Sequence, residues 1–399
     1  MLFSDNHDTQ RKIVLQNVHV FDGSEFTGPQ TVVMHKGIIS SNPENADEII
    51  DGKGRFLITG LIDCHVHLHH VGHLQQLAAN GVTTALDMAM WPADKMNSLR
   101  ETPGLPDIRS AGLPVTAAGS LHSCMMPLLE EALLAGSEHA EAFVEKRIAE
   151  GSDYIKLISD IPGPAQETLN AVTEAAHQRD KMVVAHASTY TPFEMALRAK
   201  VDLITHVPRD KPISIATAKE MIENNIISVP TLTMMQAVSA NPPLSAALGM
   251  IFKPSLFMAI LRSKRNSQGA QTYENARDSV TTMYRAGVPI LAGTDCHEEP
   301  NSFFDVKHGA SLHRELELLV EAGLSPREVL RAATILPAQF FRLLDRGVIE
   351  EGKRADLVLL REDPTRDIRA SRGIDRVWCG GIEYEVDHDK TISHRARVE

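Results

Sequence analysis

The sequence has 399 residues, more than most single domains contain. Its hydrophobic content of 43% is enough for an ordinary globular core. Forty Lys and Arg side chains stand against 52 Asp and Glu side chains, so the net charge is −12. Such an acidic balance argues against nucleic acid or an anionic membrane as the main partner.

The cysteines and the N-terminal stretch indicate the compartment. The four cysteines lie far apart and form no CxxC pair, so they do not form a disulfide framework. The start, MLFSDNHDTQRKIVL, lacks the charged region and long apolar run of a signal peptide. No run of about 18 apolar residues could span a membrane. We expect a protein of the cytoplasm with a small-molecule substrate. The oligomeric state is left open, with a homo-oligomer among the options.

Both ends of the chain have the pattern of short strands. Residues 12–59 alternate between apolar and polar positions and are interrupted by glycines. The same texture returns in GVIEEGKRADLVLLREDP (347–364) and RVWCGGIEYEV (376–386). We therefore predict that residues 1–59 and 345–399 together form a small β-sandwich.

Between these ends, short apolar runs alternate with stretches of helical periodicity. Eight strands are predicted at 60–67, 82–88, 108–119, 154–159, 182–187, 202–207, 226–232 and 288–295. Helices are predicted between them at 73–80, 140–151, 165–180, 192–200, 215–225 and 273–287, and two more follow near 308–323 and 325–344. Strand–helix alternation repeated eight times predicts an α/β fold, a (β/α)8 TIM-like barrel over residues 60–344.

One connection is too long for a tight turn. Residues 236–270 contain the apolar side chains Met250, Phe252, Phe257 and Met258. We expect this insertion to lie over the barrel mouth and to offer these side chains to the hydrophobic half of a substrate. Packing on the barrel itself is the alternative.

Polar residues stand at the C-terminal ends of several predicted strands. They are His65 and His67 on the first strand, then Lys156, His186, His206 and Asp295 on the fourth, fifth, sixth and eighth. The C-terminal strand ends of a (β/α)8 barrel converge on one mouth, where active sites lie. Residues far apart in the sequence are therefore expected to meet in space.

The residue types indicate a metal site. Imidazole and carboxylate groups bind zinc and can also hold Mn or Fe. His65 and His67 are two residues apart, so both point to the same face of a strand. Asp295 could bind the same ion and accept a proton from bound water.

Lys156 needs a separate explanation because an ammonium group would repel metal ions. Its apolar neighbours in DYIKLISD indicate burial, which lowers a lysine pKa and favours the neutral amine. A neutral amine can react with carbon dioxide to give an anionic carbamate whose two oxygens could bridge two metals.

Each of these residues has an ordinary explanation when taken alone. A strand histidine is commonly structural, a lysine is commonly solvated, and an aspartate in GTD commonly caps a turn. Six suitable residues, each at the end of an apolar run and in this order, are hard to obtain by chance. The set as a whole favours a metal centre.

With these residues the chain resembles the amidohydrolase superfamily over nearly its full length. GLIDCHVHL and GVIEEGKRADLVLL look like the entry and exit signatures of that family. YIKLIS, AHAST and VPTLTMM are similar to the imidazolonepropionase-like and Xaa-Pro-dipeptidase-like subgroup, which includes ochratoxin-type amidases. Imidazolonepropionases use one metal and lack the strand 4 lysine, so Lys156 favours a binuclear hydrolase.

The resemblance implies a ligand set and a reaction. One divalent ion, most commonly Zn²⁺, would be held by His65, His67, the Lys156 carbamate and Asp295. A second ion would be held by the same carbamate, His186 and His206. A hydroxide bridging the ions would attack an amide or peptide-like C–N bond, and Asp295 would transfer the proton. We expect an N-acyl amino acid, a dipeptide or an aromatic amide as substrate.

Substrate contacts are predicted from the loops that follow the strands. Arg209, three residues after His206, could bind a substrate carboxylate. Tyr190, which follows strand 5, is a second candidate contact. His69 and His297 could line the pocket, although ordinary loop positions also explain both.

Other functions remain open on the same barrel. A lactone or cyclic-amide hydrolase would use the same metal hydroxide. A deaminase or a decarboxylase would not need Lys156. A non-catalytic metal-binding scaffold is disfavoured because Asp295 is present.

Overall fold

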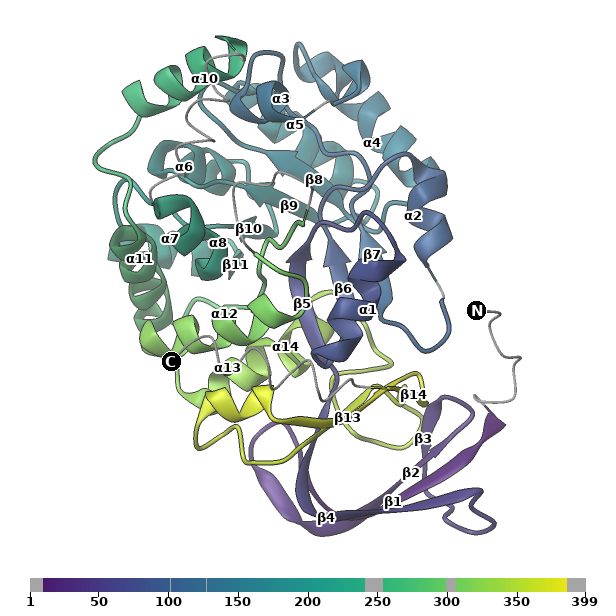
Figure 1. The fold of residues 1–399 in the computed structure, drawn as a ribbon. Helices are drawn as coiled ribbons and strands as arrows, with labels where there is room; N and C mark the ends of the chain where they lie inside the picture. Colours follow the sequence, from purple (N-terminus) through teal and green to yellow (C-terminus); the bar gives the residue numbers. More distant parts are fainter. Residues whose placement is uncertain (1–9, 101, 127, 241–253, 299–305, 386–399) are drawn as a thin grey trace.

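The structure is a computed structural model that describes residues 10–385 apart from residues 101, 127, 241–253 and 299–305. It contains a seven-stranded sheet and two smaller parallel sheets. Figure 1 shows helices surrounding the parallel strands, and the seven-stranded sheet below this larger part. No helix among the described residues is both long and apolar enough to cross a membrane.

Strands from both chain ends share the seven-stranded sheet. Its strands are β1 (Lys12–Phe21), β2 (Phe26–His35), β3 (Ile38–Ser40), β4 (Glu48–Thr59), β12 (Leu357–Leu360), β13 (Ile374–Cys379) and β14 (Ile382–Tyr384). Their order is β14-β13-β12-β4-β1-β2-β3. The two chain ends meet where β4 pairs with β12 in antiparallel register, Ile58 opposite Val358.

The predicted association of the two ends is thus present, but the described strands here form one sheet and the sandwich is not confirmed. One face buries an apolar cluster that includes Leu15, Leu57, Leu357 and Trp378. The division into residues 1–59 with 345–399 on one side and 60–344 on the other stays a prediction.

The remaining strands lie in two parallel sheets. The first contains β5 (Leu61–Val66), β6 (Val82–Asp87) and β7 (Asp107–Ser110); the second contains β8 (Ile155–Ile158), β9 (Val183–His186), β10 (Leu203–Thr205) and β11 (Ile227–Val229). Nearly all their residues are buried, as expected for parallel strands covered on both faces. These strands confirm the first seven strand predictions inside residues 60–344.

The third predicted strand is shorter than expected. Regular pairing ends at Ser110, and an isolated bridge from Val115 to Leu157 then connects this segment to β8. The bridge links the sheet of β5–β7 to the sheet of β8–β11.

The eighth predicted strand, 288–295, is not a regular strand. Isolated bridges join Ile290 to Ser228 in β11 and Cys296 to Val66 in β5, so the segment lies between the two sheets. The fold is therefore TIM-barrel-like α/β, but eight regular strands in a closed barrel are not found in the described part of the chain.

Two residues explain why this segment fails to form a strand. Pro289 has no N–H to donate to a ladder. Gly293 lies so close to its neighbours that an added Cβ would stand 2.9 Å from the His65 backbone nitrogen. The segment still exchanges backbone hydrogen bonds with both neighbouring strands, since Leu291 donates to Ser228 and Cys64 donates to the Ala292 carbonyl.

Each of the six helices predicted between the strands is present within three residues of its expected bounds, and four further α-helices in the described part of this region were not predicted. The described α-helices are α1 (Val71–Ala79), α2 (Ala93–Leu99), α3 (Leu121–Met125), α4 (Ala140–Ala149), α5 (Gln166–His177), α6 (Tyr190–Arg198), α7 (Ile215–Glu223), α8 (Leu232–Ser239), α10 (Pro254–Arg265), α11 (Tyr273–Ala286), α12 (Ala310–Glu321), α13 (Pro326–Ala332) and α14 (Ile335–Phe340). The helix predicted near 325–344 is wrong as one element, since it is divided at Thr334 into α13 and α14. Ser325 and Glu328 form a capping box that begins α13.

The insertion at 236–270 is described only in part. Met250 and Phe252 lie outside the described residues. On α10, Leu256 and Ala259, three residues apart, form the buried face, whereas Phe257 and Met258 are 49% and 48% exposed. The contact of Phe257 and Met258 with a substrate stays a prediction.

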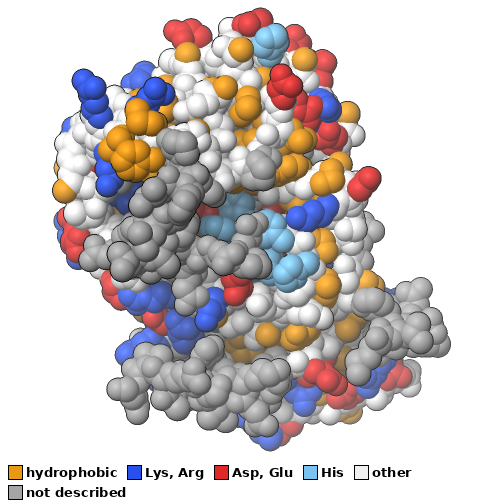
Figure 2. Space-filling view, turned by 45° about the horizontal axis from the view of Figure 1, so that its top comes forward, with side chains coloured by type: hydrophobic (Ala, Val, Ile, Leu, Met, Phe, Trp, Pro, Cys, Tyr) orange, Lys and Arg blue, Asp and Glu red, His pale blue; other side chains and the backbone are white. Residues whose placement is uncertain are grey.

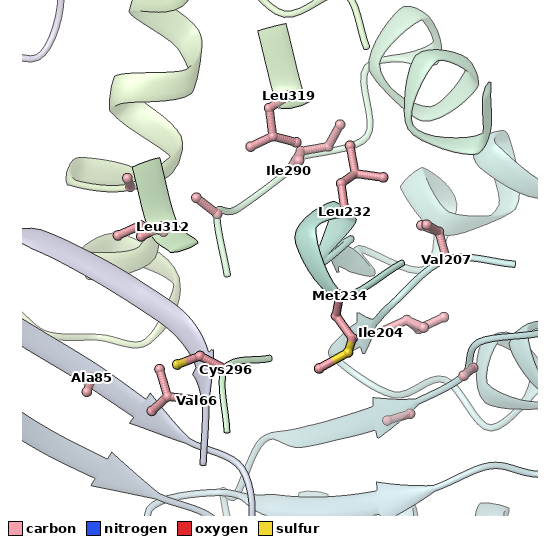
Figure 3. Close-up of a cluster of buried hydrophobic side chains, with 14 of the residues drawn as sticks. Val66, Ala85, Ile204, Val207, Leu232, Met234, Ile290, Cys296, Leu312 and Leu319 are labelled. Carbon is pink, nitrogen blue, oxygen red and sulfur yellow. The ribbon is translucent and has the colours of Figure 1, made fainter. Parts of the chain in front are cut away.

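The main core lies between the strands and the outer helices. Figure 3 shows Leu312 and Leu319 of α12 with Leu232 of α8, and Val66 beside Cys296. All five side chains are fully buried. This packing positions the strand ends that carry the polar residues described next.

Candidate metal centre

The structure brings the predicted strand-end residues together. His65 and Lys156 lie within β5 and β8, and His186 is the last residue of β9. His67 and His206 directly follow β5 and β10. Asp295 lies in the segment between β11 and β5, where its backbone N–H donates to the His65 carbonyl. Figure 2 shows histidine side chains gathered near the middle of one face of the molecule.

His65, His67 and Asp295 form the tightest group. Asp295 Oδ1 lies 3.2 Å from His65 Nε2 and 2.9 Å from His67 Nε2. Ligand atoms of all three lie within 4.8 Å of one another. The spacing of two residues between the histidines places both imidazoles on one side of the strand.

The remaining histidines extend this group into a row. The ring centroids of His65 and His206 are 5.0 Å apart, and those of His206 and His186 are 4.4 Å apart. His206 Nε2 lies 3.9 Å from Asp295 Oδ2, so the two carboxylate oxygens face different members of the row.

Burial keeps the imidazoles neutral. It lowers the pKa of His65 to about 3 and the pKa values of His186 and His206 well below their ordinary value. Burial alone would raise the pKa of Asp295, but the neighbouring His65 and the hydrogen bonds from His65 and His67 hold that pKa well below its usual range. The neutral imidazoles of His65 and His206 beside the Asp295 carboxylate match the donor set that zinc takes in proteins.

Two buried nitrogens in the row also lack an ordinary partner. His65 Nδ1 and His186 Nε2 have no hydrogen-bond partner among the described residues. Buried polar atoms are nearly always paired, so unpaired ones call for an explanation such as an ion. The residues present therefore fit divalent metal ions.

The backbone is held in an unusual conformation at this site. His206 and Asp295 have φ values of 69° and 59°, in the left-handed region that non-glycine residues seldom adopt. Thr231 joins them with φ 50°, although it is β-branched, and its Oγ1 lies 2.6 Å from His206 Nδ1. Such conformations persist at functional sites where the surrounding structure imposes them.

Lys156 is buried as the sequence indicates. It is 4% exposed, and its Nζ donates a hydrogen bond of 2.9 Å to Thr205 Oγ1. Burial lowers the pKa of Lys156 to about 7, so a large fraction of the side chain is a neutral amine at neutral pH.

Buried carboxylates support the ligand-bearing segments. Asp63 accepts hydrogen bonds from the His65 backbone N–H and from Thr294. These hydrogen bonds connect β5 to the segment that contains Asp295. Glu315 of α12 accepts from the N–H groups of Leu232 and Thr233 at the start of α8. Burial raises the pKa values of Asp63 and Glu315 to about 7.

The four predicted substrate contacts lie in different surroundings. His297 stacks edge-on with His67 at 5.9 Å, and His69 Nδ1 lies 3.5 Å from Lys95 Nζ. Tyr190 is buried at the start of α6, and the Lys211 ammonium covers its ring at 4.0 Å.

Arg209 lies beyond β10, where its backbone N–H donates to the Ser188 carbonyl. Its Nη1 lies 3.5 Å from the Val238 carbonyl, and its Nε has no hydrogen-bond partner among the described residues. His297 is thus the predicted contact that the structure places directly beside a metal-ligand candidate.

Two further residues of this site were missed by the sequence analysis. His122 in α3 lies with its ring 4.2 Å from the ring of His186, and Asp160 follows β8. His122 Nδ1 lies 2.5 Å from Asp160 Oδ2. A carboxylate at the end of the run DYIKLISD was a signal for Asp160, whereas no strand-end rule identifies His122.

Relatives of known function resemble the chain at low identity. It is 22% identical to 5'-deoxyadenosine deaminase of Methanothermobacter thermautotrophicus, over 90% of each chain. It is 27% identical to ochratoxinase of Aspergillus niger over 62% of this chain and 49% of that protein.

Solved structures share the fold. A Xaa-Pro dipeptidase with bound methionine in the active site matches with a TM-score of 0.76 and 22% identity, over 94% of this chain and 100% of that one. A profile of the Amidohydrolase family matches residues 56–382, which include every residue of the centre described above. The chain belongs to the Amidohydrolase family.

Proposed function

We propose that this chain is a metal-dependent hydrolase that cleaves an amide or peptide-like C–N bond of a small molecule. The observation that carries the proposal is the convergence of His65, His67, His186, His206, Lys156 and Asp295 at neighbouring strand ends. N-acyl amino acids, dipeptides and aromatic amides are the proposed substrate class.

The donor set supports two ions, most readily Zn²⁺, with Mn²⁺ or Fe²⁺ as alternatives. His65, His67 and Asp295 would hold one ion, and His186 with His206 would hold the other. The neutral fraction of Lys156 supports reaction of its amine with carbon dioxide, and the resulting carbamate would be shared by both ions. When bound, such ions supply Lewis acidity and lower the pKa of water from about 15.7 to about 7.

Asp295 is the proposed acid–base residue. Its low pKa keeps it ionised at neutral pH and makes it a weak base, which suits a group that accepts a proton only briefly and passes it on. One oxygen faces His65 and His67, and the other is 3.9 Å from His206. The carboxylate therefore lies between the two groups of proposed ligands, where it could pass a proton to the leaving amine.

The test combines metal content with a substrate screen. Protein purified without chelator and supplied with bicarbonate is analysed for metal per chain and assayed against N-acyl amino acids, dipeptides and aromatic amides. Close to two ions per chain with amide turnover supports the proposal. Close to one ion, or turnover restricted to other substrates, contradicts it.

Deamination is the second candidate, because the chain is similar to a deaminase over 90% of its length. Ammonia release from aminopurine nucleosides, without amide hydrolysis, would favour it. Parallel assays with lactones and cyclic amides separate the remaining hydrolytic alternative.

The cysteines bear on the compartment. All four are free, and Cys64, Cys296 and Cys379 are buried. This supports a reducing compartment, for which we propose the cytoplasm.

A further inference from the structure

Asp160 and His122 form a pair on the His186 side of the histidine row. His122 Nδ1 lies 2.5 Å from Asp160 Oδ2, a short contact for a hydrogen bond to a carboxylate. Asp160 is 7% exposed. The proposed function uses neither residue, so the presence of a buried carboxylate here is unexplained.

The second oxygen of Asp160 faces His186. Asp160 Oδ1 lies 3.7 Å from His186 Nε2, which is too long for a hydrogen bond. His186 Nε2 is one of the buried nitrogens that have no hydrogen-bond partner in the described part of the chain. Asp160 thus has one oxygen held by His122 and the other directed at an unpaired nitrogen.

This separation suits two ligands of one ion. Zinc bonds to histidine nitrogen and carboxylate oxygen are about 2.0–2.2 Å long, so two ligands of a tetrahedral ion lie roughly 3.3 Å apart. The distance between Asp160 Oδ1 and His186 Nε2 is a few tenths of an ångström longer. Ligand atoms of His122, Asp160 and His186 all lie within 4.8 Å of one another, as do those of His65, His67 and Asp295.

We propose that Asp160 is a ligand of the second divalent ion together with His186, and that His122 orients the Asp160 carboxylate. The inference rests on the proposed function, which assigns that ion to His186 and His206. It adds a permanent carboxylate to a site whose other anionic ligand, the carbamate on Lys156, depends on carbon dioxide. The second ion would therefore bind more weakly, but still bind, when Lys156 is unmodified.

A hydrogen-bonded partner that orients a ligand is a common feature of metal sites. Here the His122 N–H fixes Oδ2 and leaves Oδ1 available. His122 is then a positioning residue, and Asp160 is the residue that contacts the ion.

The decisive test places a thiolate at position 160. Asp160→Cys is loaded with Co²⁺ and its absorption spectrum is compared with that of the wild-type protein, which already contains Cys64 and Cys296. A new thiolate-to-cobalt charge-transfer band in the near ultraviolet is expected only if residue 160 contacts an ion. Two bound Co²⁺ ions without a new band would overturn the proposal.

Asp202→Cys is the matched control. Asp202 also pairs with a histidine, His177, at 2.9 Å, but it is partly exposed and precedes β10, whereas His206 follows that strand. This variant should load two Co²⁺ ions and show no new band. The same band in Asp202→Cys would mean that the signal is not specific to position 160, and would remove the support.

A second variant guards against a folding defect. Asp160→Asn should keep the first ion, which reports an intact fold, while the affinity for the second falls by at least 100-fold in a titration with Zn²⁺. Unchanged affinity for both ions would overturn the proposal. The two proposals can fail separately. If the wild-type protein binds two ions and hydrolyses amides, and Asp160→Asn binds both ions with unchanged affinity, the ligand assignment fails and the proposed function stands. A wild-type protein that binds no second ion would refute both.

Discussion

His206 Nδ1 lies 2.6 Å from the Oγ1 atom of Thr231, a residue held at φ 50°. The hydroxyl therefore fixes the ring orientation and leaves Nε2 to face Asp295 at 3.9 Å. The next two residues donate their N–H groups to Glu315, which holds this turn in place. A ligand's second nitrogen is commonly fixed by such a partner.

Replacing Thr231 should consequently weaken the second metal site. Thr231→Val keeps the branched shape but removes the hydroxyl, and loss of such partners typically costs about 10–100-fold in metal affinity. A Zn²⁺ titration followed by calorimetry measures the change. Thr231→Ser retains the hydroxyl and should bind normally; equal weakening in both variants would show that the hydroxyl is not the cause.

Lys156→Ala should lower the affinity for the second ion and abolish the dependence of metal loading on bicarbonate. The reason is that the buried amine, with its pKa lowered to about 7, is the group able to form a carbamate. Metal content with and without bicarbonate, and a carbon-13 carbamate signal after labelling, provide the measurement. Lys146→Ala, at an exposed lysine, is the control. Unchanged affinity for the second ion in Lys156→Ala, with the bicarbonate dependence retained, would remove the bridging role.

The strand-end residues could be predicted because their placement depends on the local pattern. Each lies at the end of an apolar run, and parallel strands bring such ends together. His122 lies instead in a short helix after β7, and its contact with Asp160 joins two residues that are 38 positions apart in the sequence. Spacing rules carry no information about loop conformation, so this pair was missed.

The eighth predicted strand depends on more than composition. The apolar run at 288–295 has the composition of a strand, but Gly293 marks a close approach to His65 that only the folded chain reveals. Composition also does not tell which face of α10 packs on the protein: Leu256 and Ala259 are buried there, whereas Phe257 and Met258 are about half exposed.

Asp295→Asn should slow amide hydrolysis by about 10²–10⁴-fold, the usual contribution of a general acid–base group. An amide oxygen cannot accept the proton and binds metal more weakly than a carboxylate, so turnover is compared at a Zn²⁺ concentration that restores full metal loading. Turnover and metal content are measured on the same preparation. Full activity with full metal content would exclude Asp295 as the proton acceptor. Asp202→Asn, at the exposed pair with His177, serves as the control and should leave both unchanged.

Glu315 should make the protein less stable as the pH rises. Burial raises its pKa to about 7 from the model-compound value of 4.5, so the folded state holds a proton that the unfolded state releases between these values. The free energy of unfolding therefore falls from pH 5 to pH 8, by up to roughly 3 kcal/mol from this one group. Glu315→Gln cannot ionise and should show a shallower decline. Urea unfolding of both proteins at pH 5 and pH 8, with metal content matched, tests this. Parallel declines in the two proteins would mean that Glu315 is already ionised at pH 5, and that its hydrogen bonds from Leu232 and Thr233 outweigh its burial.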